Sequence, residues 1–192
     1  MDRMAKASQE EFLKRIEQRT GYKYLPIIGP RKASVLAELI RRVRPKRVLE
    51  VGTLIGYSAI VMGKELEGDA EMITIEIDED EAKLARENIR ASGIKPRVEV
   101  LIGDALELIP KLKGSFDFVF LDAAKDEYLD YLRLVEPKLH KGSMIVADNV
   151  RSVTVAPMLY MGEYLKYVRK SGRYESRLIS VGWDGMEVST KL

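Results

Sequence analysis

The chain has 192 residues, of which 32 are basic and 30 acidic, and it contains one histidine and no cysteine. The nearly balanced charge gives no sign of nucleic-acid binding, and a single histidine with no cysteine excludes thiolate nucleophiles, Ser-His-Asp triads and ordinary zinc sites. No apolar run approaches the roughly 18 to 20 residues that span a bilayer, and the charged N-terminus does not resemble a secretory signal, so we expect a cytoplasmic protein.

Apolar periodicity predicts helices and strands in alternation. Residues 9–19 form an amphipathic pattern, and the extended segment 25–30 leads into a second helix over 31–43. The further predicted helices begin at Ser58 and cover 79–91, 105–112, 128–139 and 155–170. The predicted strands are 48–51, 72–77, 97–102, 116–121, 143–147, 174–181 and 186–190.

This alternation predicts an α/β fold of the Rossmann-like, doubly wound kind, with helices on both faces of a seven-stranded sheet. The sheet is expected to be mostly parallel. Only the short turn 182–185 joins the last two strands, so one strand near the C-terminus must run antiparallel. We predict a single domain over 1–192, in which residues 1–30 are an N-terminal helical extension.

Five basic residues gather near the end of the second predicted helix: Arg41, Arg42, Arg44, Lys46 and Arg47. They can be interpreted as a solvated helix end that complements the helix dipole, or as a nucleic-acid patch.

A glycine turn follows the first predicted strand and precedes the helix at Ser58. Gly52 permits a tight turn, and the free N–H groups of the helix start can bind an anionic group. The spacing from Glu50 to Gly56 is E-x-G-x-x-x-G, which differs from the dinucleotide pattern G-x-G-x-x-G. Glu50 would repel a pyrophosphate but attract an ammonium, so the turn favours a cofactor that carries an amino acid.

Acidic residues also follow the next two strands, where ligands bind in such sheets. Glu76 lies near the end of the second strand, and its carboxylate could accept hydrogen bonds from both hydroxyls of a ribose. Gly103, Asp104 and Ala105 follow the third strand and could meet an adenine. Asp104 could equally cap the helix that starts beside it.

The ends of the fourth and fifth strands carry three oxygen donors, which are Asp122, Asp148 and Asn149. If these strands are neighbours, their ends lie about 5 Å apart and the donors converge. Two carboxylates and an amide suit a hard divalent cation such as Mg²⁺. The alternative is ordinary turn chemistry, in which Asp and Asn are common.

Together these motifs resemble those of the class I S-adenosylmethionine (SAM) dependent, cation-dependent O-methyltransferases of the catechol and caffeoyl-CoA type. The resemblance rests on Glu50-x-Gly52, Glu76, Leu121-Asp122-x-x-Lys125 and Ala147-Asp148-Asn149, and it extends over about residues 27–191. It implies that Asp122, Asp148 and Asn149 hold Mg²⁺, or Mn²⁺ or Ca²⁺ in its place. It also implies that Lys125 and Asp122 are catalytic, with Lys125 as the base. The implied SAM-binding residues are Ile28, Glu50, Gly52, Leu54, Ser58, Glu76, Ile77, Gly103, Asp104, Ala105 and Asp122.

The chain departs from the catechol enzymes between Asp122 and Lys125, where Ala123 and Ala124 replace bulky side chains and lower the expected pocket wall. Arg151 could meet an anionic group of the acceptor or be solvated. Tyr160, Met161 and Trp183 are candidates for the pocket rim, although we expect Trp183 to pack in the core.

The predicted function is SAM-dependent methyl transfer to a hydroxyl beside a second metal-chelating oxygen, as in a catechol-like small molecule. Methylation of 5-hydroxyuridine in tRNA is the alternative activity. A dinucleotide oxidoreductase and a non-catalytic SAM-binding protein are alternatives from other classes. The resemblance further implies a homodimer, with the N-terminal helix as a candidate interface.

Overall fold

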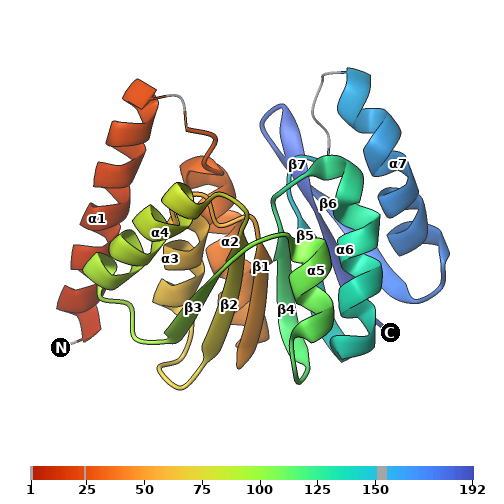
Figure 1. The fold of residues 1–192 in the computed structure, drawn as a ribbon, viewed down its shortest axis with the longest axis horizontal. Coiled ribbons are helices and arrows are strands. Elements are labelled where there is room, and N and C mark those ends of the chain that lie inside the picture. Colours follow the sequence, from red (N-terminus) through yellow and green to blue (C-terminus); the bar gives the residue numbers. More distant parts are fainter. Residues whose placement is uncertain (1, 24, 151–154) are drawn as a thin grey trace.

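The computed structural model describes residues 2–23, 25–150 and 155–192, and it contains one seven-stranded sheet with the order β3-β2-β1-β4-β5-β7-β6 (Figure 1). The strands are β1 (Arg47–Val51), β2 (Glu71–Glu76), β3 (Arg97–Ile102), β4 (Phe116–Leu121), β5 (Leu139–Ala147), β6 (Tyr174–Val181) and β7 (Asp184–Lys191). The first five strands are parallel, and β7 runs antiparallel to both of its neighbours, β5 and β6. The predicted fold class is therefore confirmed.

Seven α-helices are described: α1 (Asp2–Lys23), α2 (Gly29–Val43), α3 (Tyr57–Glu65), α4 (Glu79–Ser92), α5 (Ala105–Leu108), α6 (Tyr128–Val135) and α7 (Val155–Lys170). Short 3₁₀ turns extend α5 (Ile109–Lys111), precede α6 (Lys125–Glu127) and follow it (Glu136–Lys138). Helices α1 to α4 lie on one side of the sheet and α5 to α7 on the other (Figure 1). None of the described helices is long and apolar enough to cross a membrane.

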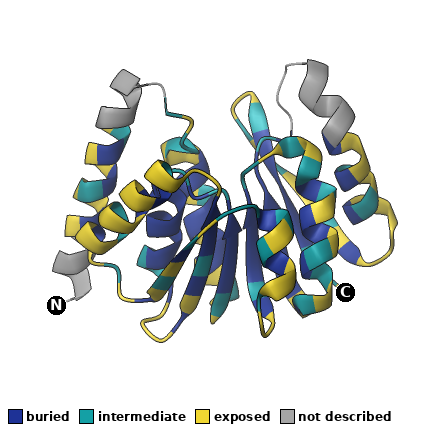
Figure 2. Ribbon diagram, in the orientation of Figure 1, coloured by how far each residue is buried: buried dark blue, intermediate teal, exposed yellow. Residues whose placement is uncertain are grey.

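Each face of the sheet has its own apolar core. Side chains alternate along β1, so that Val48 joins the cluster under α1, α2 and α3, while Leu49 and Val51 join the cluster under α5, α6 and α7. Leu13 and Ile16 of α1 are buried in the first cluster, as the amphipathic pattern predicted. The strands in the middle of the sheet, such as β1 and β4, are accordingly more buried than the edge strands β3 and β6 (Figure 2).

The main error in the predicted elements concerns 128–139, which was expected to be one helix. Helix α6 ends at Val135, a 3₁₀ turn containing Pro137 follows, and Leu139 already belongs to β5. A proline in this position removes a helical N–H, which explains the early end. Leu139 is 7% exposed, and a buried leucine is compatible both with the end of a helix and with the start of a strand.

Candidate active site

The loops after β1, β4 and β5 begin side by side at one edge of the sheet. Each first loop residue donates its backbone N–H to the neighbouring strand: Gly52 to Ile75 (3.0 Å), Asp122 to Val51 (2.8 Å) and Asp148 to Leu121 (2.9 Å). This ladder fixes the starting point of each loop. It places the residues after the strands at the crevice where ligands bind in doubly wound sheets.

Gly52 cannot be replaced by a larger residue without movement of this edge. Its φ is +97°, and a Cβ built on it would lie 2.1 Å from the backbone oxygen of Asp122. The glycine therefore lets the β1 turn and the start of the β4 loop touch.

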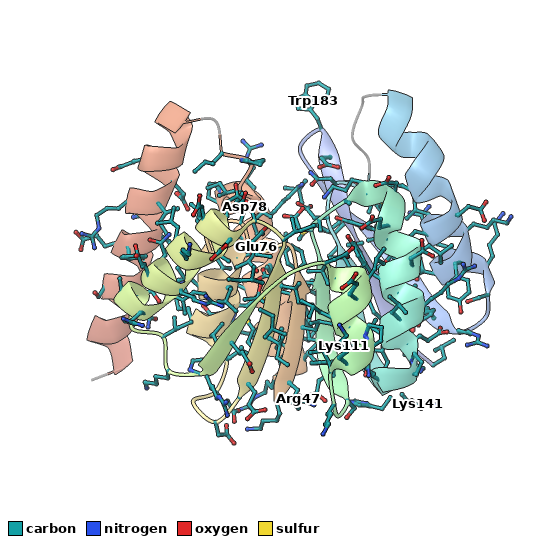
Figure 3. The ribbon with its side chains drawn as sticks, viewed as in Figure 1. Arg47, Glu76, Asp78, Lys111, Lys141 and Trp183 are labelled. Atoms are coloured by element: carbon teal, nitrogen blue, oxygen red, sulfur yellow. The ribbon has the colours of Figure 1, made fainter. Side chains whose placement is uncertain are left out.

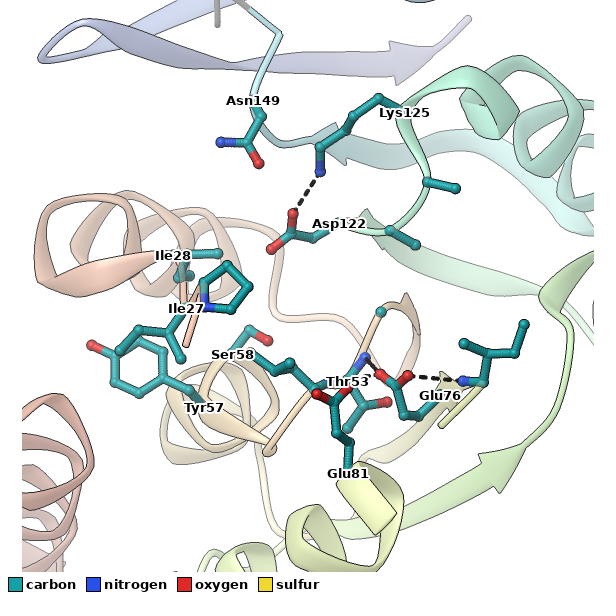
Figure 4. A pocket seen from close by; sticks show the side chains of 16 residues that line it. Ile27, Ile28, Thr53, Tyr57, Ser58, Glu76, Glu81, Asp122, Lys125 and Asn149 are labelled. Carbon is teal, nitrogen blue, oxygen red and sulfur yellow. Dashed lines mark hydrogen bonds and ion pairs between the residues drawn. The ribbon is translucent and has the colours of Figure 1, made fainter. Parts of the chain in front are cut away.

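A cavity of about 390 Å³ opens at this edge (Figure 4). Its lining comes from the segment before α2, the β1–α3 turn, the end of β2 and the loops after β4 and β5. The lining residues are Pro26, Ile27, Ile28, Gly52, Thr53, Leu54, Tyr57, Ser58, Glu76, Ile77, Glu81, Asp122, Ala123, Ala124, Lys125 and Asn149. Of the predicted cofactor-binding residues, Ile28, Gly52, Leu54, Ser58, Glu76, Ile77 and Asp122 thus face one space.

Glu76 is held by four backbone N–H groups. One carboxylate oxygen accepts from Thr53 (3.1 Å) and Leu54 (2.7 Å), and the other accepts from Ile77 (2.9 Å) and Asp78 (3.1 Å). Glu76 is only 7% exposed, so these bonds fix the carboxylate and tie the glycine turn to the end of β2. The result is a rigid anionic group on the cavity wall.

Glu50 does not line the cavity, and its place beside a cofactor ammonium stays a prediction. It is fully buried behind the turn, where one oxygen accepts a hydrogen bond from Thr74 Oγ1 (2.5 Å). The other oxygen has no hydrogen-bond partner among the described residues. Burial raises the pKa of Glu50 to about 8, because the charged form loses its hydration.

Gly103, Asp104 and Ala105 also lie outside the cavity lining. Asp104 caps α5 by accepting the N–H of Leu106 at 2.8 Å, so the capping alternative is confirmed. Gly103 donates its N–H to Glu76 O at 2.9 Å, within the same ladder of strand ends. A contact of these three residues with adenine stays a prediction.

The three predicted metal ligands occupy different depths. Asp122 and Asn149 line the cavity, whereas Asp148 is 1% exposed and is not part of its lining. Burial raises the pKa of Asp148 to about 6, and the negative charge of Asp122 contributes to the rise. No cluster of three His, Cys, Asp or Glu side chains suited to a metal occurs in the described part of the chain. A metal would therefore depend on two carboxylates and the amide oxygen of Asn149.

Lys125 also faces the cavity. Its Nζ donates to Asp122 Oδ1 (2.9 Å; dashed in Figure 4) and to the hydroxyl of Tyr128 (2.7 Å). Tyr128 is fully buried and donates in turn to the backbone oxygen of Leu121 at 2.9 Å. An ammonium has three N–H donors, so one direction stays open for a bound ligand.

Some polar residues at this site were not predicted: Thr53, Tyr57 and Glu81 line the cavity, and Lys32, Asp184 and Tyr128 contact the predicted residues. Lys32 of α2 lies 2.6 Å from Asp148 Oδ1 and 2.7 Å from Asp184 Oδ2, and the buried Tyr128 holds Lys125. The position of Lys32 carried a signal in the sequence, because a lysine in the first turn of a helix opposes the helix dipole and needs an acidic partner. Tyr128 carried none beyond its place on the apolar face of α6.

The predicted rim is only partly described. Trp183 is 90% exposed at the tip of the β6–β7 hairpin, so its expected core position is wrong (Figure 3). The turn there consists of Gly182 and Trp183 alone. Trp183 thus lies beyond the ends of both strands, where its side chain has no strand to pack against. Met161 is buried in the core under α7 and does not line the cavity. Arg151 and the side chain of Tyr160 lie outside the described residues.

These features define a Rossmann-like α/β protein whose ligand cavity sits at the carboxyl ends of the central strands. The family model for O-methyltransferases matches residues 3–191. The chain is 36% identical to catechol O-methyltransferase B of Danio rerio over 156 residues, which is 78% of this chain and 57% of that protein. It is also 36% identical to catechol O-methyltransferase of Sus scrofa over 155 residues, covering 77% and 80% of the two chains. The chain belongs to the O-methyltransferase family.

The matched region covers little more than half the length of two of these relatives, 57% of the Danio rerio protein and 56% of the Mus musculus catechol O-methyltransferase. Solved structures agree over more of the chain. An O-methyltransferase from Bacillus cereus in complex with SAH matches with a TM-score of 0.85 at 26% identity, over 94% of this chain and 91% of that one. The O-methyltransferase TomG from Streptomyces achromogenes, in complex with SAM, matches with a TM-score of 0.84 at 25% identity, over 94% and 89%.

Proposed function

We propose that the protein transfers a methyl group from SAM to a hydroxyl of a small molecule whose neighbouring oxygen chelates the same divalent cation, as in a catechol. The observation that carries this proposal is the single cavity that Glu76, Asp122, Lys125 and Asn149 share. The walls of this cavity carry a carboxylate for the cofactor (Glu76), oxygen ligands for a cation (Asp122 and Asn149) and an amine that can take up a proton (Lys125). The catechol O-methyltransferases among the relatives support the same reaction class.

The cofactor half of the cavity is the side of Gly52, Leu54, Ser58 and Glu76. In the proposal, the fixed carboxylate of Glu76 accepts hydrogen bonds from the ribose hydroxyls. Ile77 is 72% exposed beside it, and an apolar side chain at this place suits the face of an adenine ring. SAM would supply the methyl group, and the helix start after Gly56 offers N–H groups to its carboxylate.

The donor set fits a hard cation. Asp122 and Asp148 follow neighbouring parallel strands, and burial together with mutual repulsion raises the pKa of Asp148 to about 6. A positive ion between these carboxylates relieves that repulsion. Mg²⁺ prefers oxygen ligands, and it would lower the pKa of a chelating hydroxyl and so favour its anionic form.

Lys125 is proposed to handle the proton of the acceptor hydroxyl. Asp122 and Tyr128 hold its Nζ, so the amine cannot swing away from the cavity. In its uncharged form it can accept the proton as the hydroxyl becomes a nucleophile. Holding the hydroxyl in line with the methyl group supplies the remaining acceleration.

The surface charges favour a small acceptor over tRNA. In the basic cluster, Arg41 pairs with Glu65 (3.2 Å), Arg44 with Glu67 (3.0 Å) and Lys46 with Glu67 (2.7 Å). The cluster also lies near the start of β1, and Figure 3 places Arg47 at the end of the sheet away from Glu76 and Trp183. Paired charges far from the cavity give little attraction to a polyanion.

A methyl-transfer screen tests the proposal, with catechols, hydroxycinnamoyl esters and hypomodified tRNA as acceptors, each with Mg²⁺ and with a chelator. We expect Mg²⁺-dependent methylation of a catechol or hydroxycinnamoyl acceptor. Transfer to tRNA that weakens steeply with salt would favour the tRNA alternative. SAM binding without transfer to any acceptor would favour a non-catalytic protein, and a thermal shift with NAD but not SAM would indicate an oxidoreductase.

A further inference from the structure

Three short contacts link the proposed metal ligands to β7. Lys32 Nζ lies 2.6 Å from Asp148 Oδ1 and donates to Asp184 Oδ2 at 2.7 Å. Asn149 Nδ2 donates to the same Asp184 Oδ2 at 2.6 Å. The chain of contacts joins α2, the end of β5 and the start of β7, which are far apart in sequence.

Lys32 is held by these acids rather than by its own helix. Its side chain is 9% exposed, against 2% for Asp148 and 20% for Asp184. A buried ammonium is stable only when it is paired, and a positive charge in the first turn of α2 opposes the helix dipole. Lys32 therefore fixes Asp184 in place.

Asp184 decides which end of the Asn149 amide faces the cavity. Rotation about the last torsion of asparagine is roughly two-fold, so the side chain itself does not distinguish its oxygen from its nitrogen. Asp184 accepts from the nitrogen, and the oxygen points toward Asp122 and Lys125 (Figure 4). Only the carbonyl oxygen can bind a cation, since the NH₂ group has no free electron pair to offer.

We propose that Asp184, anchored by Lys32, is a positioning residue for the metal site: it holds the amide of Asn149 with the oxygen turned toward the cation. This inference rests on the proposed function, because it takes Asn149 as a ligand. Asp184 does not line the cavity, so it acts through Asn149. Toward the Asn149 amide its oxygen acts as a hydrogen-bond acceptor, whereas its negative charge serves the pairing with Lys32.

Titration of the full-length protein with Mn²⁺, followed by electron paramagnetic resonance of the free ion, tests the proposal without any turnover. Asp184→Ala should weaken Mn²⁺ binding by about 10- to 100-fold, the usual loss when the partner of a metal ligand is removed. Asp184→Asn keeps an acceptor oxygen and should retain most of the affinity. Binding of S-adenosylhomocysteine should be unchanged in both variants.

The matched control is Asp126→Ala, which removes an exposed acid next to Lys125 that is not the acceptor of the Asn149 amide. Its Mn²⁺ affinity should stay close to that of the wild type. If Asp184→Asn binds as weakly as Asp184→Ala, charge rather than orientation is responsible and the proposal is wrong. Unchanged binding by Asp184→Ala overturns only the positioning role, whereas a wild-type protein that does not bind Mn²⁺ overturns the metal site as well.

Discussion

The four N–H groups around Glu76 make Glu76→Gln a sharp test of how the cofactor side is built. Glutamine has nearly the same shape but carries one oxygen and one NH₂ group. Whichever way the amide turns, its NH₂ meets two N–H donors, either those of Thr53 and Leu54 or those of Ile77 and Asp78. Two charge-assisted hydrogen bonds are lost in a nearly buried place.

Each such bond contributes roughly 1.5 to 3 kcal/mol, so the loss of two lowers the free energy of unfolding by about 3 kcal/mol even at the low end. For a chain of this size, that corresponds to a fall in melting temperature of roughly 6 to 12 °C. The ligand-free proteins are compared by thermal unfolding followed with circular dichroism. Calorimetry with S-adenosylhomocysteine should also show weaker binding, since the ribose loses an acceptor.

Glu81→Gln is the control, because Glu81 lines the same cavity but accepts none of the four N–H groups. It should melt close to the wild type. A ligand-free Glu76→Gln protein that melts with the wild type would refute the idea that this carboxylate ties the glycine turn to β2.

Two further predictions follow from the same edge of the sheet. Folding raises the pKa of Glu50 from 4.5 to about 8. The protonated carboxyl therefore contributes to the free energy of unfolding in full below pH 4.5, and this contribution is lost as the pH rises through about 8. Melting temperatures measured from about pH 5 to about pH 9 should therefore fall for the wild type relative to Glu50→Gln, and parallel curves would show that Glu50 is charged throughout. Gly52→Ala should unfold the protein or destabilise it far more than the control Gly142→Ala. Gly142 has a similar φ of +89°, but a Cβ built on it meets no atom within 4 Å. Equal losses of stability in urea denaturation would contradict the predicted clash with Asp122.

Much of the fold could be predicted because clear breakers separate the strands and helices along the chain. The predicted strands 97–102, 116–121 and 174–181 and the helix 155–170 have the bounds that the structure gives. The error at 128–139 arose because apolar periodicity continues through Leu139 into the next strand. Periodicity records burial and does not record which element is buried.

The candidate site could be predicted only as far as the strand ends. Parallel strands bring their following residues to one edge, and this placed Glu76, Asp122 and Asn149 together. The contacts of Lys32 could not be foreseen, since Asp148 and Asp184 reach it from distant parts of the chain. The burial of Glu50 depends on how the turn folds over it, and the sequence pattern is silent on that.

Asp122, Asp148 and Asn149 are proposed to hold one cation beside the cofactor cavity. Crystals grown with S-adenosylhomocysteine and Mn²⁺ test it directly through the anomalous signal of manganese. We expect one strong peak with oxygens of all three side chains about 2.1 to 2.4 Å away, close to the distances at which hard cations bind oxygen. No peak at this edge, or a peak bound by other residues, would contradict the account.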